Sequence, residues 1–283
     1  YYTEFILGLP FETLQTWKKG LCAAVEAGCH HHIDIHPLEV LKNSAFAQQV
    51  KQFNYEVFTF TVVTKKQPSL IPERHNYVIA SEFMTRQQYI DSWMFSWLVL
   101  HFHHYAWTQL LARFARKYKD LSYLQFYEDL FEQCISKDPF FMDLYNKQEA
   151  ELKSFFWNTS SDTVFDNDNV IVVLNQIEWH ENRDKVQQII SDWARTYFSD
   201  LEDDLLEEVI HMNTLWVTNM GRHDVHEEMF DYNIPEYIVG DQELVKQPVT
   251  YTFSNKYRWP NNKDFKDKLF YKNRNGFSIQ KIE

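Results

Sequence analysis

Two segments near the start of the chain decide the predicted fold: residues 5–13, FILGLPFET, and residues 33–39, IDIHPLE. The first is an apolar run that ends at a Gly-Leu-Pro turn signal, and the second is a strand-like segment closed by Pro37. Between them, residues 12–27 carry apolar side chains three or four positions apart, as on one face of a helix: Leu14, Trp17, Leu21 and Val25. Strand, helix and strand in so short a span predict a parallel pair joined by a right-handed crossover.

The turn of residues 8–13 has the chemistry of a ligand-binding edge. A strand that stops here and restarts as a helix brings backbone N–H groups and a helix N-terminus to the carboxyl edge of a parallel sheet, where α/β proteins bind ligands. Gly8 permits close approach of a ligand, Pro10 fixes the turn, and Glu12 and Thr13 place polar groups at the rim. An ordinary strand-to-helix turn is the alternative for so short a motif.

The turn and the segment of residues 33–39, taken together, resemble the B12-binding (cobalamin-dependent) radical SAM enzymes. In that family a GLPGET-type loop follows the fifth strand of a partial TIM barrel, and an IDIHPLE-like segment forms the sixth strand. The resemblance covers residues 1–50. It implies an α/β piece, the last βα units of the partial barrel, followed by a mostly α-helical accessory domain with a few C-terminal strands. We expect these domains to span residues 1–75 and 76–283.

The resemblance also implies where S-adenosylmethionine would lie. The residues implied to be beside its methionine and ribose belong to the first strand and its loop: Ile6, Gly8, Leu9, Pro10 and Glu12. Those implied to be near its adenine belong to the second strand: Ile35, His36 and Pro37. Phe11 stands where the family has glycine, the residue that best tolerates mirror conformations, so we expect a narrowed or distorted pocket mouth.

The cysteines do not complete the family's cofactor set. There are three, Cys22, Cys29 and Cys134, and none has the spacing CxxxCxxC. Family chemistry needs three thiolates to hold a [4Fe–4S] cluster that binds S-adenosylmethionine. We therefore expect the cluster and the cobalamin to be held by upstream segments that act as partners of this chain, and the chain alone to be inactive. The opening residue Tyr1, in place of Met, agrees with a fragment.

For the intact enzyme, the resemblance implies reductive cleavage of S-adenosylmethionine to a 5′-deoxyadenosyl radical. That radical would abstract hydrogen from a small-molecule substrate, and cobalamin would assist a methyl transfer or a rearrangement. Two alternatives remain open. One is a non-catalytic helical interaction or scaffold protein with a coincidental βαβ start. The other is a small-molecule binding remnant that keeps the nucleotide edge without chemistry.

Charge and composition exclude several classes of partner. With 28 basic against 40 acidic residues the net charge is −12, which repels phosphate backbones and argues against a nucleic-acid partner. Residues 92–112 carry no formal charge and are long enough to span a membrane. Their histidines, Thr108 and Gln109 are costly in hydrocarbon, so we expect a buried core helix and no membrane partner. The sparse, odd cysteine count favours a reducing, cytoplasmic location.

Beyond residue 85 the pattern is helical. Thr85 and Gln88 form a capping box that opens a helix predicted to run to about residue 119, and Ser122 with Gln125 can open the next. Further helices are predicted over residues 143–156, 182–198 and 200–220. Upstream, residues 38–50 predict a short helix, and residues 55–63 and 77–80 predict strands. Strands are also predicted over residues 247–259 and 276–279.

Histidines and aromatic residues suggest further sites, each with a plainer interpretation. His101 and His104 share a helical face without a carboxylate one turn away, so we expect core histidines and no metal site. His223 and His226 are predicted to lie in a solvated polar turn. The aromatic stripe that begins at Trp93 and Trp97 could line a substrate or corrin cavity, although a packed core is the expected role. Residues 166–169 lack the glycine and terminal glutamate of a calcium loop and predict an ordinary loop.

Overall fold

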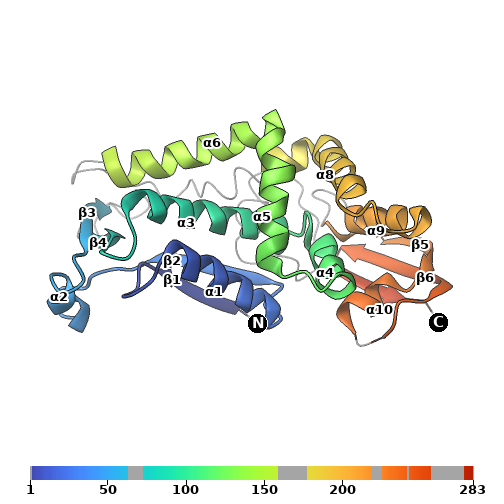
Figure 1. The fold of residues 1–283 in the computed structure, drawn as a ribbon, viewed down its shortest axis with the longest axis horizontal. Helices are drawn as coiled ribbons and strands as arrows, with labels where there is room; N and C mark the ends of the chain where they lie inside the picture. Colours follow the sequence, from blue (N-terminus) through green and yellow to red (C-terminus); the bar gives the residue numbers. More distant parts are fainter. Residues whose placement is uncertain are drawn as a thin grey trace. The chain divides into compact units, whose positions relative to one another are not determined.

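The computed structural model describes residues 2–62, 73–158, 177–217, 225–240, 242–255 and 277–282. The chain divides into two compact units. Unit 1 comprises Tyr1–Cys29, Ile33–Trp97 and Pro139–Ile171, and unit 2 comprises His30–His32, Leu98–Asp138 and Val172–Glu283. Figure 1 labels the elements of both. Unit 1 draws residues from both sides of the predicted boundary at residue 75.

Unit 1 begins with a strand, a helix and a strand: β1 (Tyr2–Leu7), α1 (Leu14–Glu26) and β2 (His32–Pro37). The two strands pair in a two-stranded sheet. Thr3 Oγ1 lies 3.4 Å from Cys29 Sγ, and the Leu38 N–H donates to the Leu7 carbonyl at 2.8 Å, so the strands run in the same direction. A Thr13–Thr16 capping box opens α1, and Gly28, at φ +95°, follows its end. The helix agrees closely with the predicted residues 12–27.

Helix α1 covers one face of this strand pair. Trp17 is buried, and its ring meets Phe5 edge-on at a centroid distance of 6.0 Å. The Trp17 indole N–H donates to the Ser96 hydroxyl at 2.9 Å and to the Ser92 carbonyl at 3.2 Å, which ties α1 to α3 (Arg86–Val99). A buried indole with its donor satisfied anchors a helix without a desolvation penalty.

A second sheet of unit 1 extends from the end of β2. Strands β3 (Glu56–Val62) and β4 (Glu73–Ala80) pair antiparallel. The Val78 N–H donates to the Leu38 carbonyl at 2.9 Å, and a small core forms around this junction from Leu38, Val40, Phe53, Tyr55 and Val78. Because Leu38 and Val40 bond to β4, the helix predicted over residues 38–50 shrinks to α2 (Ala45–Gln49). Unit 1 also contains α6 (Pro139–Lys153) and the π-helix η3 (Ser154–Asn158).

The continuous helix predicted over residues 85–119 was wrong in its middle. Its start is as predicted, since Thr85 and Gln88 exchange backbone-to-side-chain hydrogen bonds of 2.9 and 3.3 Å. After α3 the chain forms the π-helix η1 (Leu100–His104) and then places Ala106 at φ +69°, before α4 (Gln109–Tyr118) begins. A left-handed residue ends a right-handed helix. The aromatic stripe from Trp93 and Trp97 therefore does not continue along one helix.

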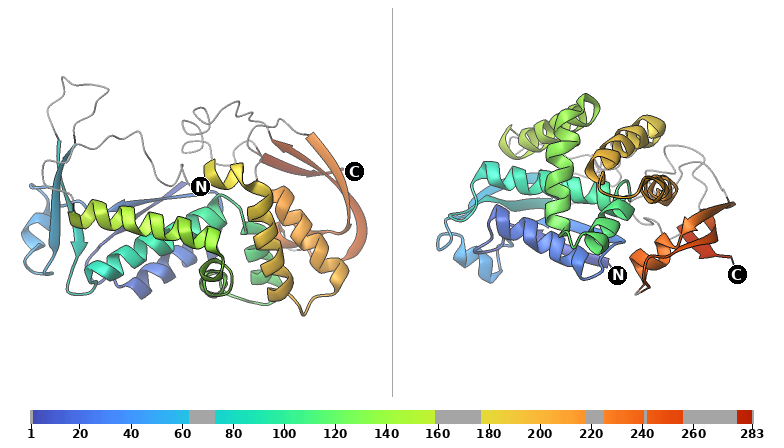
Figure 2. Two further views of the ribbon diagram at one scale, coloured as in Figure 1. Left: turned by 90° about the horizontal axis from the view of Figure 1, so that it is seen from above. Right: turned by 45° about the vertical axis from the view of Figure 1, so that its right-hand side comes forward.

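Unit 2 combines helices with a three-stranded antiparallel sheet of order β5-β6-β7. Helix α9 contacts α4, α8 and β5 (Figure 2). Besides η1 and α4, its elements in chain order are α5 (Tyr123–Gln133), the 3₁₀ helix η2 (Ile135–Lys137), α8 (Arg183–Tyr197), α9 (Asp203–Trp216), β5 (Val225–Tyr232), α10 (Ile234–Val239), β6 (Lys246–Asn255) and β7 (Phe277–Lys281).

The sequence predicted β6 and β7 but missed β5. The solvated polar turn expected at His226 was wrong, because His226 lies in strand β5. Val225 and Met229 are exposed, and the opposite face begins with the polar His226 and Glu228, so the strand lacks the apolar alternation of a half-buried strand. His223 and the loop expected over residues 166–169 lie outside the described residues.

The uncharged stretch of residues 92–112 is core, as expected. His101, His103, His104, Thr108 and Gln109 are each at most 2% exposed. Across the described ranges, no helix combines the length and the apolar character that crossing a membrane requires.

The cysteine at the end of α5 should be chemically inert in the folded chain. Cys134 is buried, and burial raises the pKa of its thiol to about 12, with the nearby Asp138 charge acting in the same direction. The reactive thiolate should therefore be almost absent at pH 8. Iodoacetamide at pH 8, read out by mass spectrometry, should leave Cys134 unlabelled in the native chain and label it after denaturation. Native labelling of Cys134 as fast as the half-buried Cys29 would contradict this burial.

Candidate functional site

The turn after β1 is closed by its own glutamate. Gly8 has φ +104°, and its N–H donates to the Glu12 carboxylate, with 2.7 Å between Gly8 N and Glu12 Oε2. The Glu12 N–H in turn donates to the Leu9 carbonyl at 3.2 Å. Burial raises the pKa of Glu12, and the backbone N–H groups of Gly8 and Leu9 act against that rise. The loop is thus pre-formed around a partly desolvated carboxylate.

Gly8 is needed for its backbone conformation more than for space. A Cβ built at Gly8 would meet Val78 Cγ1 at 3.5 Å and Leu38 Cβ at 3.6 Å, which are ordinary contacts. The positive φ is what L-residues resist, at a cost of about 1–2 kcal/mol. The expected role of Gly8, close approach of a ligand, is therefore joined by a conformational one.

Phe11 takes the mirror conformation that its position requires. Its φ is +64°, and its side chain is 67% exposed. The ring packs on Phe83 and Phe53 at centroid distances of 5.0 and 5.5 Å. Such aromatic pairs contribute about 0.5–1.5 kcal/mol each, enough to offset much of the backbone strain. The non-glycine residue is therefore held at the rim of the turn by its aromatic neighbours.

The residues predicted to bind S-adenosylmethionine come from two strand ends that lie side by side, because Leu38 bonds to Leu7. Among them Ile6, Leu9 and His36 are exposed, whereas Gly8 is buried. Side chains alternate along a strand, so His36 lies on the face opposite Ile33, which is buried. By the same alternation Ile35 shares the face of Ile33. Pro10, Glu12 and Pro37 are half-buried at this edge. Their binding role stays a prediction.

The open face of the strand pair also carries a group that the sequence analysis missed. One potential ligand atom each from Glu4, Asp34 and His36 lies within 4.8 Å of the other two. Glu4 is on β1, and the other two are alternate residues of β2. Alternation alone could have paired Asp34 with His36, but only the strand pairing adds Glu4. Exposed acidic groups of this kind also occur without a metal.

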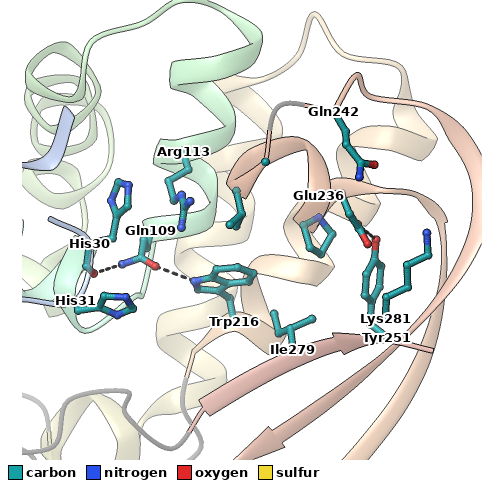
Figure 3. A pocket seen from close by; sticks show the side chains of 13 residues that line it. His30, His31, Gln109, Arg113, Trp216, Glu236, Gln242, Tyr251, Ile279 and Lys281 are labelled. Atoms are coloured by element: carbon teal, nitrogen blue, oxygen red, sulfur yellow. Dashed lines mark hydrogen bonds between the residues drawn. The ribbon is translucent and has the colours of Figure 1, made fainter. Parts of the chain in front are cut away.

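Unit 2 holds a cavity of about 660 Å³ (Figure 3). That volume is in the range of small-molecule sites. Its lining comes from the segment before β2, from α4, from the end of α9, from α10 and from the sheet: His30, His31, Gln109, Arg113, Trp216, Pro235, Glu236, Val239, Gly240, Gln242, Tyr251, Ile279 and Lys281. This cavity could not be predicted from the sequence, because its residues are up to about 250 positions apart and form no local motif.

The Gln109 side chain fixes one wall of the cavity. Its amide Nε2 donates to the carbonyl of His30 at 2.7 Å and to that of His103 at 3.0 Å. Its Oε1 accepts the Trp216 indole N–H at 2.9 Å. Because the amide nitrogen donates and the amide oxygen accepts, the amide group has a single orientation, and the Trp216 indole is held in place. Figure 3 shows this chain from His30 through Gln109 to Trp216.

A chain of hydrogen-bonded side chains extends from the same wall of the cavity into the core. His30 Nδ1 lies 2.9 Å from His103 Nε2, and His103 Nδ1 lies 2.5 Å from the Tyr127 hydroxyl. His103 and Tyr127 are fully buried. The core role expected for the histidines of this segment agrees with these partners. The His103 contacts also depend on the π-helix η1, a form that often occurs at functional positions.

Two curated proteins are similar to part of this chain. One is the cobalamin-dependent radical SAM methyltransferase TokK of Streptomyces tokunonensis, 28% identical over 133 residues. The other is 2-(S-pantetheinyl)-carbapenam-3-carboxylate methyltransferase of Streptantibioticus cattleyicolor, 29% identical over 133 residues. Each match covers 46% of this chain and 20% of the relative, so it spans about a fifth of the relative's length.

No family model matches the chain. The two similarities nevertheless support a relationship to cobalamin-dependent radical SAM methyltransferases, which is the family that the sequence of residues 5–13 and 33–39 resembles.

Two glycines of unit 1 should respond oppositely to alanine. Gly8→Ala should lower the free energy of unfolding by about 1 kcal/mol, because alanine resists φ +104°. Gly20→Ala should raise it by about 0.5–1 kcal/mol, because Gly20 lies inside α1 with no atom near its absent Cβ. Denaturant unfolding measures both. Equal effects of the two substitutions would argue against the left-handed turn at Gly8.

Proposed function

We propose that this chain is part of a cobalamin-dependent radical SAM methyltransferase, in which β1–α1–β2 belongs to the end of the partial barrel and supplies one wall of the S-adenosylmethionine site. The similarity to TokK over 133 residues carries the proposal. The closed, left-handed turn between β1 and α1 supports it, because it lies at the carboxyl edge of a parallel strand pair.

The exposed groups at this edge fit one side of S-adenosylmethionine. Ile6 and Leu9 are 45% and 36% exposed and offer apolar contact to a flat base or a methionine chain. His36 adds an exposed polar ring on the same face as Ile6. The Glu12 carboxylate holds the turn through the Gly8 N–H, so the backbone that a ligand would meet is already ordered. When bound, S-adenosylmethionine supplies the radical and methyl chemistry of such enzymes.

The cysteines of this chain do not fit a [4Fe–4S] cluster. Cys22 is buried in α1, and Cys134 is buried at the end of α5 in unit 2. Cys29 lies 3.4 Å from the Thr3 hydroxyl, and cluster ligation needs several thiolates around one centre. We therefore assign the cluster and the cobalamin to other segments of the protein. A small-molecule substrate and a cytoplasmic location stay predictions.

The proposal is tested on the full-length protein that contains this chain. A CxxxCxxC motif should precede residue 1, and the anaerobically reconstituted protein should form 5′-deoxyadenosine from S-adenosylmethionine and a reductant. Binding of S-adenosylmethionine without 5′-deoxyadenosine would favour the binding remnant. If the protein lacks the motif and shows neither binding nor turnover, the scaffold alternative is correct.

The wall assigned to β1 yields a sharper test within that protein. Ile6→Trp should weaken S-adenosylmethionine binding by about tenfold or more, because the larger ring occupies the space beside the exposed strand face. Leu41→Trp is the matched control, since Leu41 is also exposed in unit 1 but lies outside the strand pair. Calorimetric titration measures both. Equal affinities of the two variants would remove Ile6 from the site.

A further inference from the structure

The cavity of unit 2 is lined by a cation, Arg113, that has no carboxylate partner among the described residues. Arg113 projects from α4 into the cavity lining (Figure 3). Its guanidinium donates to the Ile238 carbonyl at 3.3 Å, which uses one of five donors. Within the described residues, no carboxylate forms an ion pair with Arg113. Burial lowers the pKa of Arg113, which shows that its charge is partly desolvated.

Two cations near the C-terminal end of α4 differ from Arg113 in having a carboxylate partner. Arg116 forms an ion pair with Asp120 one turn away, and Lys119 forms one with Asp200. Lys117 donates to the carbonyls of Tyr237 and Gly240 at 2.5 and 2.6 Å. A chain with a net charge of −12 has many carboxylates, and none in the described part of the chain pairs with Arg113, which favours an anion that comes from outside.

The rest of the lining defines the shape of such a ligand. Trp216 and Ile279 give the cavity an apolar middle, and Figure 3 shows them between Arg113 on one side and Tyr251 and Lys281 on the other. At the sheet side, Glu236 accepts a hydrogen bond from the Tyr251 hydroxyl, and Lys281 adds a second cation. The Glu236 charge is therefore partly satisfied by Tyr251, and the Arg113 end is the side that attracts an anion.

The wall beside Arg113 is built before any ligand arrives. Gln109, one helical turn before Arg113, is buried and bonded to His30, His103 and Trp216. This network holds the indole and fixes the start of α4, so little side-chain ordering remains to oppose binding. A pre-organised apolar cavity with one convergent charge is the usual form of a small-molecule site.

We propose that the unit 2 cavity binds a small organic carboxylate, with Arg113 paired to the carboxylate and Trp216 and Ile279 packed on the apolar part. A planar guanidinium fork matches a carboxylate in two parallel hydrogen bonds. The site is independent of the S-adenosylmethionine wall assigned to unit 1, and its test does not require turnover.

The test compares charged and neutral forms of one probe on the full chain. 3-Phenylpropionate should bind saturably at millimolar concentration in calorimetric titrations, and 3-phenylpropionamide, of nearly the same shape, should bind about tenfold more weakly or worse. Inorganic phosphate is the third probe. Saturable binding of phosphate as tight as that of the carboxylate would overturn the choice of an organic carboxylate, and so would equal binding of the acid and the amide.

Variants of α4 assign the effect to Arg113. Arg113→Gln should weaken 3-phenylpropionate binding about ten- to hundredfold, whereas Arg116→Gln, on the same helix but outside the cavity lining, should bind as the unaltered chain does. Arg113→Lys keeps the charge without the fork and should fall between them. Should Arg113→Gln fail to fold, the lysine variant and the acid–amide comparison decide. The proposal would be overturned if folded Arg113→Gln or Arg113→Lys bound 3-phenylpropionate as tightly as the unaltered chain, or if the unaltered chain showed no saturable binding.

Discussion

The ligand-sized cavity of unit 2 depends on one buried primary amide. The Gln109 side chain offers two donors and one acceptor, and each kind has a partner that comes from a distant part of the sequence. An amide buried without such partners would cost about 1–3 kcal/mol, so the loop of His30, the π-helix and the end of α9 are constrained together. The position of the Trp216 indole follows from this single group.

Some helices and strands could be predicted from the sequence and others could not, for different physical reasons. Helix α1 and the openings of α3 and α5 were predictable because caps and apolar periodicity are local. The break at Ala106 was not, because alanine at positive φ leaves no signal in composition. Strand β5 was missed because the face that carries the buried Phe230 and Tyr232 begins with His226 and Glu228, and because strand pairing is decided by β6, a distant segment.

The candidate sites were unequally visible from the sequence for the same reason. The turn of residues 8–13 was found because the strand, the glycine and the helix start follow one another in the chain. The Glu4, Asp34 and His36 group needed the pairing of β1 with β2, and the unit 2 cavity needed segments between residues 30 and 281 to meet. Local motifs reveal sites at strand ends, whereas sites that assemble from several elements require the fold.

The mirror conformation of Phe11 has a consequence for how this loop evolves. A glycine at that position would need no support, but a phenylalanine is tolerated here while Phe53 and Phe83 receive its ring. The three aromatic positions are therefore under joint selection: sequences with glycine at residue 11 are free to vary residue 83, and sequences with phenylalanine there are not. Loss of Phe83 should then accompany or follow reversion of residue 11 to glycine, so the order of substitutions along a lineage carries a record of this backbone strain.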